Sequence, residues 1–351
     1  MVKNLNLLFA ILRPIGIFYA FVMKLRAWLF DKGVLPSHTI RVPVISAGNL
    51  TMGGSGKTPV VIYLARYMLR QGLKPAVVSR GYGGKASKRV NIVSDGTKIL
   101  LDSRQAGDEP RLIAESVPNA YVLTGKKRVF PCRHAAEIFH CDVIILDDGF
   151  QHLNVRRDMD LVLFNAATLQ NTMHVFPGGF LRESFSALKR ADCFLITGYT
   201  EELSEEISVF HQFINTRWQN TPFFCLEYMP QYFIDRNGDT SPLSAINSSA
   251  LAFCGIASPE RFHNSLKRIS ITPVGFLSFQ DHKMYDEKSI QKIKNLAVQH
   301  GAEILLTTEK DLVKLKHADF GLPLYALSMQ VERHPDFDAY LNKFLPVLKN
   351  R

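Results

Sequence analysis

The sequence predicts an α/β protein built on a doubly wound, mostly parallel sheet with a phosphate-binding loop (P-loop). Short apolar runs alternate with helical patterns through most of the chain, which is typical of a parallel sheet with helices on both faces. A glycine-rich turn at residues 53–58 separates one such run from the helix pattern after it. A second apolar run ends in two adjacent acids, Asp147 and Asp148. In such sheets ligands bind at the carboxyl ends of the strands.

Composition sets the first bounds on function. The 351 residues are 46% hydrophobic and 21% charged, which indicates a folded chain long enough for two domains. The formal net charge of +10 suits a nucleotide, a nucleic acid or an acidic membrane face. No nucleic-acid module or aromatic–basic repeat is present, so we expect no nucleic-acid partner. The five cysteines contain no C-x-x-C pair, which argues against disulfides and a zinc site.

Residues 1–36 are predicted to be an N-terminal amphipathic helix that associates with a membrane. Residues 5–30 are mostly apolar, and residues 1–30 contain four basic residues and no acid. A spanning helix needs about 20 apolar residues, and Arg13-Pro14 interrupts the run. We therefore favour a helix, or a kinked pair, in the membrane interface over a core helix of the first domain, and a true span is the third alternative. No small-residue cleavage site follows, so a signal peptide is not expected.

Residues 51–58 form the stretch around which the chain is organised. They follow a predicted buried strand at 42–47 and precede a predicted helix at 59–70 that ends at Gly72. The usual G-x-x-x-x-G-K-[ST] pattern has glycine where this chain has Thr51, but three close glycines and correct flanks outweigh that departure. Backbone N–H groups of the loop and the helix N-terminus would hold phosphates. Lys57 would reach the β- and γ-phosphates and the Thr58 hydroxyl would hold Mg²⁺, so the predicted nucleotide-binding residues are Gly53, Gly54, Ser55, Gly56, Lys57 and Thr58.

The next segments continue the alternating pattern. A strand at 75–79 runs into the glycine-rich loop 80–84, and Asp95-Gly96 predicts a hairpin within residues 90–101. A helix begins at residues 107–110, a strand follows at 121–124, and Lys126, Lys127 and Arg128 open a helix that runs to residue 139. These three basic residues could bind a substrate phosphate or form a solvated helix start, and the sequence does not distinguish the two.

The strand at 143–148 ends in carboxylates of the kind that position Mg²⁺ opposite a phosphate loop. Either Asp147 or Asp148 could contact the metal directly. Further strands are predicted at 161–164 and 193–197, with a loop between them that contains Arg182 and Glu183. Arg182 could stabilise phosphate charge during phosphoryl transfer.

The pattern changes near residue 222, which divides the chain. We assign residues 37–222 to the P-loop domain, 223–240 to linker strands and 241–351 to a smaller C-terminal α/β domain. In the second domain strands are predicted at 251–254, 303–307 and 323–327, and helices at 286–300, at 336–348 and from Ser258-Pro259-Glu260 onward.

Taken together, the motifs resemble the tetraacyldisaccharide 4′-kinase family of lipid A biosynthesis, over nearly the whole chain. The resemblance rests on residues 48–50 leading into 53–59, on 79–83, on Gly107-Asp108-Glu109-Pro110, on 147–152 with Arg157-Asp158, on 176–183, on Asp281-His282 and on 308–311. Two departures are Ser184, where the family often has proline, and Lys283, where a second histidine is common.

The resemblance implies ATP-dependent phosphorylation, with Mg²⁺, of the 4′-hydroxyl of a tetraacylated glucosamine disaccharide 1-phosphate, the lipid A precursor. It implies a peripheral or monotopic protein at the cytoplasmic face of the bacterial inner membrane, where residues 1–30 would reach a substrate held in the bilayer. It further implies that Glu183 is a carboxylate on the metal side of the site. It also implies that Asp108 is the catalytic base and that His282 is its partner. Without it, Asp108 is simply an acid favoured at a helix start and His282 a loop histidine.

The alternative function is a membrane-recruited P-loop ATPase switch without small-molecule phosphorylation. The loop of that class follows the pattern K-G-G-x-G-K-[ST] and needs a lysine that reaches across a dimer. This chain has Met52 at that position, which counts against the switch and favours the kinase.

Overall fold

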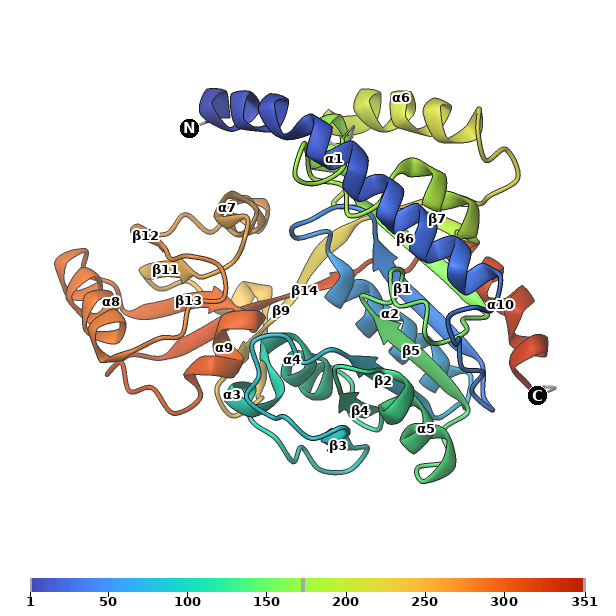
Figure 1. Ribbon diagram of the computed structural model, residues 1–351. Helices are drawn as coiled ribbons and strands as arrows, with labels where there is room; N and C mark the ends of the chain where they lie inside the picture. The colour runs from blue at the N-terminus through green and yellow to red at the C-terminus, as the bar shows by residue number, and fades with distance from the viewer. Residues whose placement is uncertain (1, 172–173, 350–351) are drawn as a thin grey trace.

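Two β-sheets organise the molecule (Figure 1). The computed structural model describes the backbone of residues 2–171 and 174–349 and the side chains of residues 9–169 and 174–346. The first sheet has the order β3-β4-β2-β5-β1-β6-β7-β8, and only the edge strand β3 runs antiparallel to its neighbour. Its strands are β1 (Val44–Asn49), β2 (Pro75–Ser79), β3 (Asn91–Asp95), β4 (Tyr121–Thr124), β5 (Val143–Asp147), β6 (Met159–Asn165), β7 (Cys193–Thr197) and β8 (Phe223–Leu226).

Helices cover both faces of this sheet, which confirms the predicted doubly wound arrangement. The apolar face of α2 (Lys57–Arg70) packs on one side together with α4 (Asp108–Ser116) and α10 (Pro335–Lys349). The other side is covered by α5 (Val129–Glu137) and α6 (Ser204–Asn215). Because both faces are buried, the central strands are continuous apolar runs rather than alternating ones. Short helices complete this part: α3 (Ser103–Ala106), η1 (Ala166–Asn171), η2 (Phe185–Arg190) and η3 (Glu201–Leu203).

The second sheet has the order β10-β9-β14-β13-β11-β12. It is parallel from β14 to β12 and antiparallel at β9 and β10. Apolar residues of α8 and α9 pack on one face and those of α7 on the other. The elements are β9 (Tyr228–Asp235), β10 (Thr240–Pro242), η4 (Leu243–Ala245), β11 (Ala250–Cys254), α7 (Pro259–Arg268), β12 (Gly275–Ser278), α8 (Glu287–Gln299), β13 (Ile304–Thr308), α9 (Glu309–Leu315) and β14 (Leu324–Val331).

The chain crosses between the two bodies twice. The segment predicted as linker, residues 223–240, is divided between the sheets, because β8 pairs with β7 in the first and β9 pairs with β14 in the second. After β14 the chain returns, and α10 packs against α2 with the Phe337 ring stacked on Tyr63 at 5.9 Å. The C-terminal helix thus belongs to the core of the first body.

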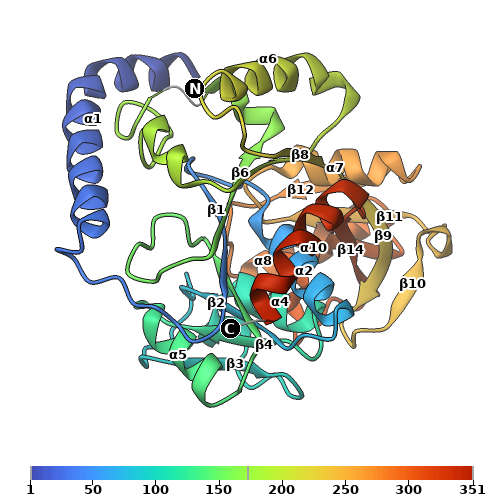
Figure 2. The ribbon, with the colours of Figure 1, turned by 90° about the vertical axis from the view of Figure 1, so that its right-hand side faces the viewer.

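The N-terminal helix α1 (Val2–Asp31) stands against the outer side of the first body and bends sharply along its length (Figure 2). Pro14 lies inside it, and a proline removes one helical hydrogen bond and crowds the preceding turn, which explains the bend. Gly16 lets the helix approach the loop at 174–181, because a Cβ there would lie 2.7 Å from the carbonyl oxygen of Val175. Within the described part of the chain, no helix combines the length and hydropathy that crossing a bilayer requires.

One local prediction holds only in part. The Asp95-Gly96 turn forms, but its second arm makes just an isolated bridge between Ser94 and Ile99 rather than a strand. β3 instead forms its ladder with β4 and is the edge strand of the first sheet. Helix α6 was not predicted, although its buried residues Ile207, Phe210 and Ile214 repeat at helical spacing.

Candidate active site

Three neighbouring strands bring the predicted motifs to one edge of the first sheet. In the order β2-β5-β1, the loop 80–84 follows β2, the acids Asp147 and Asp148 end β5, and the phosphate loop follows β1. Gly48 in β1 allows the turn after Asp148 to pack closely, because a Cβ at that position would lie 2.6 Å from Cβ of Phe150. Side chains far apart in the sequence therefore meet at the carboxyl ends of parallel strands.

The phosphate loop ends at Gly56, which has a φ of 70° and precedes the first residue of α2. This left-handed conformation favours glycine. A Cβ there would also lie 2.3 Å from the hydroxyl of Tyr228, which donates a 2.6 Å hydrogen bond to the Gly56 carbonyl. Lys57 and Thr58 consequently lie in the first turn of α2, where backbone N–H groups and the helix dipole favour an anion.

Side chains from outside the loop hold its carbonyl groups. The Asn165 amide donates to the Gly54 carbonyl at 3.0 Å, and the Thr197 hydroxyl donates to the Ser55 carbonyl at 2.8 Å. Arg261, from α7 of the second body, donates to the Asn165 side-chain oxygen. The loop conformation is thus supported by the ends of β6 and β7 and by the second domain.

Lys57 joins the loop to the acids of β5. Its Nζ lies 3.3 Å from Oδ1 of Asn49 and 3.4 Å from Oδ1 of Asp148. Both carboxylate oxygens of Asp148 accept 2.9 Å hydrogen bonds from Nη1 of Arg182. Burial alone would raise the pKa of Asp148, but the charges of Lys57 and Arg182 outweigh it and the pKa is lowered. Asp148 is therefore an ionised group that organises two cations.

Asp147 has a different environment. Its side chain is buried, and Oδ1 makes no hydrogen bond to any described residue. Burial, together with the nearby acids Glu109 and Asp148, raises the pKa of Asp147 to about 7. An unpartnered carboxylate oxygen beside a second acid fits a divalent cation. No group of three or more His, Cys, Asp or Glu side chains suited to a metal occurs among the described residues.

Glu183 is held by another partner. The carboxylate is buried, and both of its oxygens accept 3.1 Å hydrogen bonds from Nη2 of Arg190, whose guanidinium lies over the Phe150 ring. The structure therefore gives Glu183 an arginine partner in the loop that carries Arg182. Within the described side chains, Glu183 makes no hydrogen bond or ion pair with Asp147 or Thr58.

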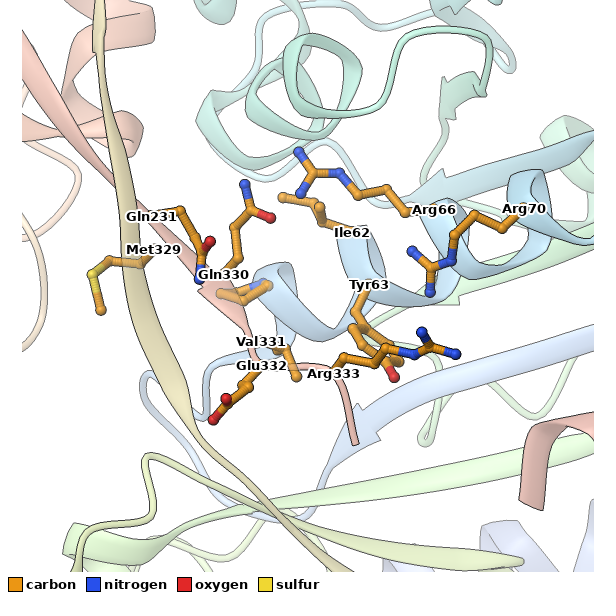
Figure 3. Close-up of a pocket in the computed structure, with 11 residues that line it drawn as sticks. Ile62, Tyr63, Arg66, Arg70, Gln231, Met329, Gln330, Val331, Glu332 and Arg333 are labelled. Carbon is orange, nitrogen blue, oxygen red and sulfur yellow. The ribbon is translucent and has the colours of Figure 1, made fainter. Parts of the chain in front are cut away.

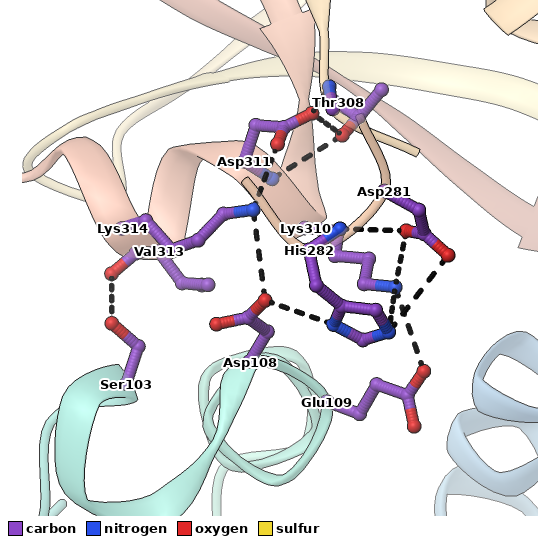
Figure 4. Close-up of polar contacts among 11 residues, drawn as sticks. Ser103, Asp108, Glu109, Asp281, His282, Thr308, Lys310, Asp311, Val313 and Lys314 are labelled. Carbon is purple, nitrogen blue, oxygen red and sulfur yellow. Dashed lines mark hydrogen bonds and ion pairs between the residues drawn. The ribbon is translucent and has the colours of Figure 1, made fainter. Parts of the chain in front are cut away.

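Asp108 and His282 meet across the two domains (Figure 4). Asp108 is the first residue of α4, and its Oδ2 lies 3.4 Å from Nδ1 of His282, which comes from the loop between β12 and α8. Tyr82, from the loop after β2, packs edge-on against the His282 ring at 5.7 Å. The structure thus brings together two residues that are 174 positions apart.

Two residues near this site were not predicted to act in it. Lys314 of α9 lies 3.6 Å from Oδ2 of Asp108, and Lys310 lies 3.3 Å from Nε2 of His282. Lys310 falls in the 308–311 motif that carries the family resemblance, so its signal was present in the sequence. Lys314 has no motif around it and only its position in the fold identifies it.

The three basic residues at 126–128 separate in the structure. Lys126 and Lys127 are exposed, whereas Arg128 is buried and donates to the Asp148 carbonyl at 3.3 Å. Arg128 also lies 3.3 Å from Nδ1 of His152. Burial, then the positive charges of Arg128, Arg157, Arg26 and Arg80, lower the pKa of His152 to about 3. A cationic cluster therefore borders Asp148, and His152 within it is neutral.

A pocket of about 240 Å³ lies elsewhere, between α2 and the strands β9 and β14 (Figure 3). Arg66, Arg70 and Arg333 contribute to its wall. Arg66 donates to the Ser116 carbonyl, and Arg333 pairs with Asp338. None of the predicted site residues lines this pocket, so it is separate from the candidate active site.

Comparisons with known proteins identify the family that this chain resembles. The family model described as tetraacyldisaccharide-1-P 4′-kinase, LpxK, matches residues 8–346. A tetraacyldisaccharide 4′-kinase of Desulfotalea psychrophila is 45% identical over 96% of this chain and 97% of its own, and one of Syntrophotalea carbinolica is 39% identical over 98% and 94%. The crystal structure of an "apo" form of LpxK from Aquifex aeolicus in complex with ATP is 30% identical, with a TM-score of 0.77 over 96% of this chain and 99% of that one.

Proposed function

The chain belongs to the tetraacyldisaccharide-1-phosphate 4′-kinase family, and from this premise we propose how its residues divide the reaction among them. It is an ATP-dependent phosphotransferase that phosphorylates the 4′-hydroxyl of the tetraacylated disaccharide 1-phosphate in lipid A biosynthesis. The ATPase-switch alternative is not favoured. The contact between Asp108 and His282, beside a phosphate loop supported by both domains, is the observation that carries the proposed division of roles.

The phosphate loop and Lys57 bind the nucleotide in this proposal. Backbone N–H groups at the start of α2 receive the phosphates of ATP, and Lys57 exchanges its contact with Asp148 for the β- and γ-phosphates. Arg182, already beside Asp148, neutralises charge that develops on the transferred group. Asp148 acts as the anchor that keeps both cations near the phosphates.

Asp147 and the Thr58 hydroxyl are the residues that would hold Mg²⁺. The buried, unpartnered Oδ1 of Asp147 supports this choice over Asp148, whose oxygens are engaged by Arg182 and Lys57. When bound, the ion would neutralise negative charge on the phosphates of ATP. Glu183 would join the metal only if it released Arg190, so its role in this proposal is to hold the loop of Arg182.

Asp108 is the proposed general base for the 4′-hydroxyl. A carboxylate at the start of α4 accepts the proton as the hydroxyl attacks, and His282 orients that carboxylate through Oδ2. The two come from different domains, so the base is complete only when the domains meet. This arrangement limits phosphoryl transfer to the closed molecule.

The cationic cluster of Arg26, Arg80 and Arg128 is the proposed site for the 1-phosphate of the substrate. All three positive charges help to lower the pKa of His152, which lies next to the turn after Asp148. Arg128 is buried and planar guanidinium groups suit phosphate oxygens. Because Arg26 belongs to α1 and donates to the Gln151 carbonyl at 3.3 Å, the cluster also connects the N-terminal helix to the site.

We propose that α1 associates with the membrane surface at the cytoplasmic face of the inner membrane, as a peripheral or monotopic element. One side of α1 exposes a continuous row of large apolar side chains, which is far more than scattered surface hydrophobics require. The basic residues Arg13 and Lys24 are also exposed and suit anionic headgroups. The exposed row consists of Ile11, Ile15, Ile17, Phe18, Phe21, Val22, Leu25 and Trp28.

A kinase assay tests the proposed function directly. The full chain is mixed with radiolabelled ATP and tetraacyldisaccharide 1-phosphate in detergent micelles, and the product is analysed for the position of the new phosphate. We expect transfer to the 4′-hydroxyl, dependent on both acceptor and Mg²⁺. ATP hydrolysis at an equal rate without the acceptor, and no labelled lipid, would instead support an ATPase switch.

Removing the apolar row of α1 is expected to weaken membrane association. The triple variant Ile11→Ser, Phe18→Ser, Phe21→Gln loses side chains that are 62–68% exposed, so folding should be little affected. Flotation with anionic vesicles should show less bound protein, and activity on lipid substrate should fall more than ATP binding. Val298→Ser on α8, at an 82% exposed residue, is the matched control. Unchanged flotation of the triple variant contradicts the proposal.

A further inference from the structure

The interface between α4 and α9 carries a row of opposite charges from the two domains. Acids on α4 face lysines on α9 and the residue after it, and the Ser103 hydroxyl donates to the Val313 carbonyl at 3.1 Å beside them. The ion pairs are Asp108–Lys314 at 3.6 Å, Glu109–Lys310 at 3.7 Å and Glu115–Lys316 at 2.8 Å.

Lys314 differs from the other two lysines in its burial. Its side chain is 1% exposed, against 19% for Lys310 and 26% for Lys316. Removing an ammonium group from water is costly unless carboxylates compensate it. Partly exposed pairs such as Lys316–Glu115 can hold two surfaces together at a smaller desolvation cost. The burial of Lys314 is therefore more than domain docking alone requires.

Asp311 keeps Lys314 in place. The Asp311 side chain is fully buried, and its Oδ2 accepts hydrogen bonds from the Gly255 amide at 2.9 Å and the Thr308 hydroxyl at 2.7 Å. Its Oδ1 lies 2.9 Å from Nζ of Lys314, one helical turn further along α9. The Lys314 ammonium also lies over the Tyr285 ring at 5.4 Å. These contacts give the ammonium one defined position, aimed at Asp108 (Figure 4).

We propose that Lys314 is a positioning residue for Asp108, and this rests on the proposed role of Asp108 as the base. Lys314 and His282 both contact Oδ2 of Asp108. No hydrogen bond or ion pair within the described side chains involves Oδ1, so Oδ1 is the oxygen that accepts the proton of the 4′-hydroxyl. With Asp311 behind it, Lys314 holds the carboxylate in the orientation that this transfer needs.

The charged and titratable groups around Asp108 come from three elements. Lys314 and Asp311 belong to α9, His282 and Tyr285 to the segment before α8, and Glu109 to α4 itself. Lys314 lies within ion-pair distance of Asp108, and its side chain is almost fully shielded from solvent. Its removal should therefore slow proton transfer and leave ATP binding unchanged, because ATP binds at the phosphate loop.

The experiment compares Lys314→Met with Lys316→Met in the full-length enzyme. Both variants remove one ion pair from the same interface, but only the first touches the base. We expect Lys314→Met to lower kcat by about 10–100-fold, as small misplacements of catalytic groups do, with the KM for ATP unchanged. Lys316→Met should keep kcat within about twofold. Equal losses of kcat in both variants would mean that the Lys314–Asp108 ion pair serves only to dock the domains, and this result would overturn the proposal.

A double-mutant cycle with Asp108→Asn identifies the path of the effect. If Lys314 acts through Asp108, then Lys314→Met should lower kcat by no more than about twofold in the Asp108→Asn background. If the losses of kcat from Lys314→Met and from Asp108→Asn multiply in the double variant, the positioning role is refuted. If Asp108→Asn itself retains wild-type turnover, the base is wrongly assigned, which is a failure of the proposed roles and is seen separately from the Lys314 result.

A second variant separates a loss of activity from a loss of folding. Lys314→Met leaves the buried Asp311 unpaired and could lower the melting temperature. The double variant Lys314→Met, Asp311→Asn removes both charges and should recover thermal stability while kcat stays low. Recovery of kcat together with stability would show that Lys314 is only structural.

Discussion

Replacement of Lys57 by alanine is expected to remove nearly all turnover while the protein remains folded. Its ammonium is the positive charge of the loop that would reach the β- and γ-phosphates, and preorganised charges of this kind contribute about 10²–10³-fold or more to kcat. The fold should survive because Asp148 keeps both of its hydrogen bonds to Arg182 when Lys57 is absent. Steady-state kinetics with lipid acceptor and a thermal melt measure the two effects.

The matched control for Lys57 is Lys98→Ala. Lys98 is exposed in the turn after β3, so its loss removes the same charge from the chain without touching the phosphate loop. We expect turnover of this variant to stay close to wild type. Near-normal turnover of Lys57→Ala, with an unchanged melting temperature, would remove the assignment of residues 53–58 as the phosphate loop.

The second large effect is expected from Asp108→Asn. The amide cannot accept the hydroxyl proton, and general base assistance is worth about 10²–10⁴-fold. ATP binding should be retained, because Asp108 acts on the acceptor. His282→Ala should lose less, since the ring only orients the carboxylate. The measurements are kcat/KM for the acceptor and Kd for ATP in each variant.

The double variant of Asp108 and His282 decides whether the two residues form one unit. Residues that act together are strongly non-additive, so the double variant should be little slower than Asp108→Asn alone. His263→Ala is a suitable control, because His263 on α7 packs against Phe276 of β12 and, within the described side chains, makes no hydrogen bond or ion pair with Asp108. If the losses from Asp108 and His282 multiply, the shared site across the domain cleft must be abandoned.

Much of the first domain could be predicted from local sequence. The strands at 75–79, 121–124 and 193–197 were predicted with the bounds that the structure has, because each is an apolar run between clear turn signals. The phosphate loop was recognisable despite Thr51, since its glycines and the first turn of α2 are adjacent in sequence. The family followed from several such motifs together, and the comparisons confirm it.

Other features depend on partners that are distant in the chain. Arg128 could not be separated from Lys126 and Lys127 by sequence, because only the turn after β5 buries it. Glu183 stays a predicted metal-side carboxylate, and its ion pair with Arg190 could not be recognised from the sequence. The second arm of the predicted hairpin forms only an isolated bridge to Ser94, while β3 makes its ladder with the distant strand β4.

Local sequence was enough to predict most strands of the first sheet, the position of the phosphate loop and the family to which the chain belongs. These properties depend on residues within a few positions of one another, whose propensities and spacing are visible without the fold. The fold added contacts that local sequence does not reveal: Lys314 of the second domain lies beside Asp108, and Asp148 rather than Asp147 is held by Lys57 and Arg182. The contact between Asp108 and His282 was expected from the family resemblance alone. Ion pairs and burial depend on distances in space. Sheet order and the contact between the domains determine these distances for residues that are more than a hundred positions apart in the chain.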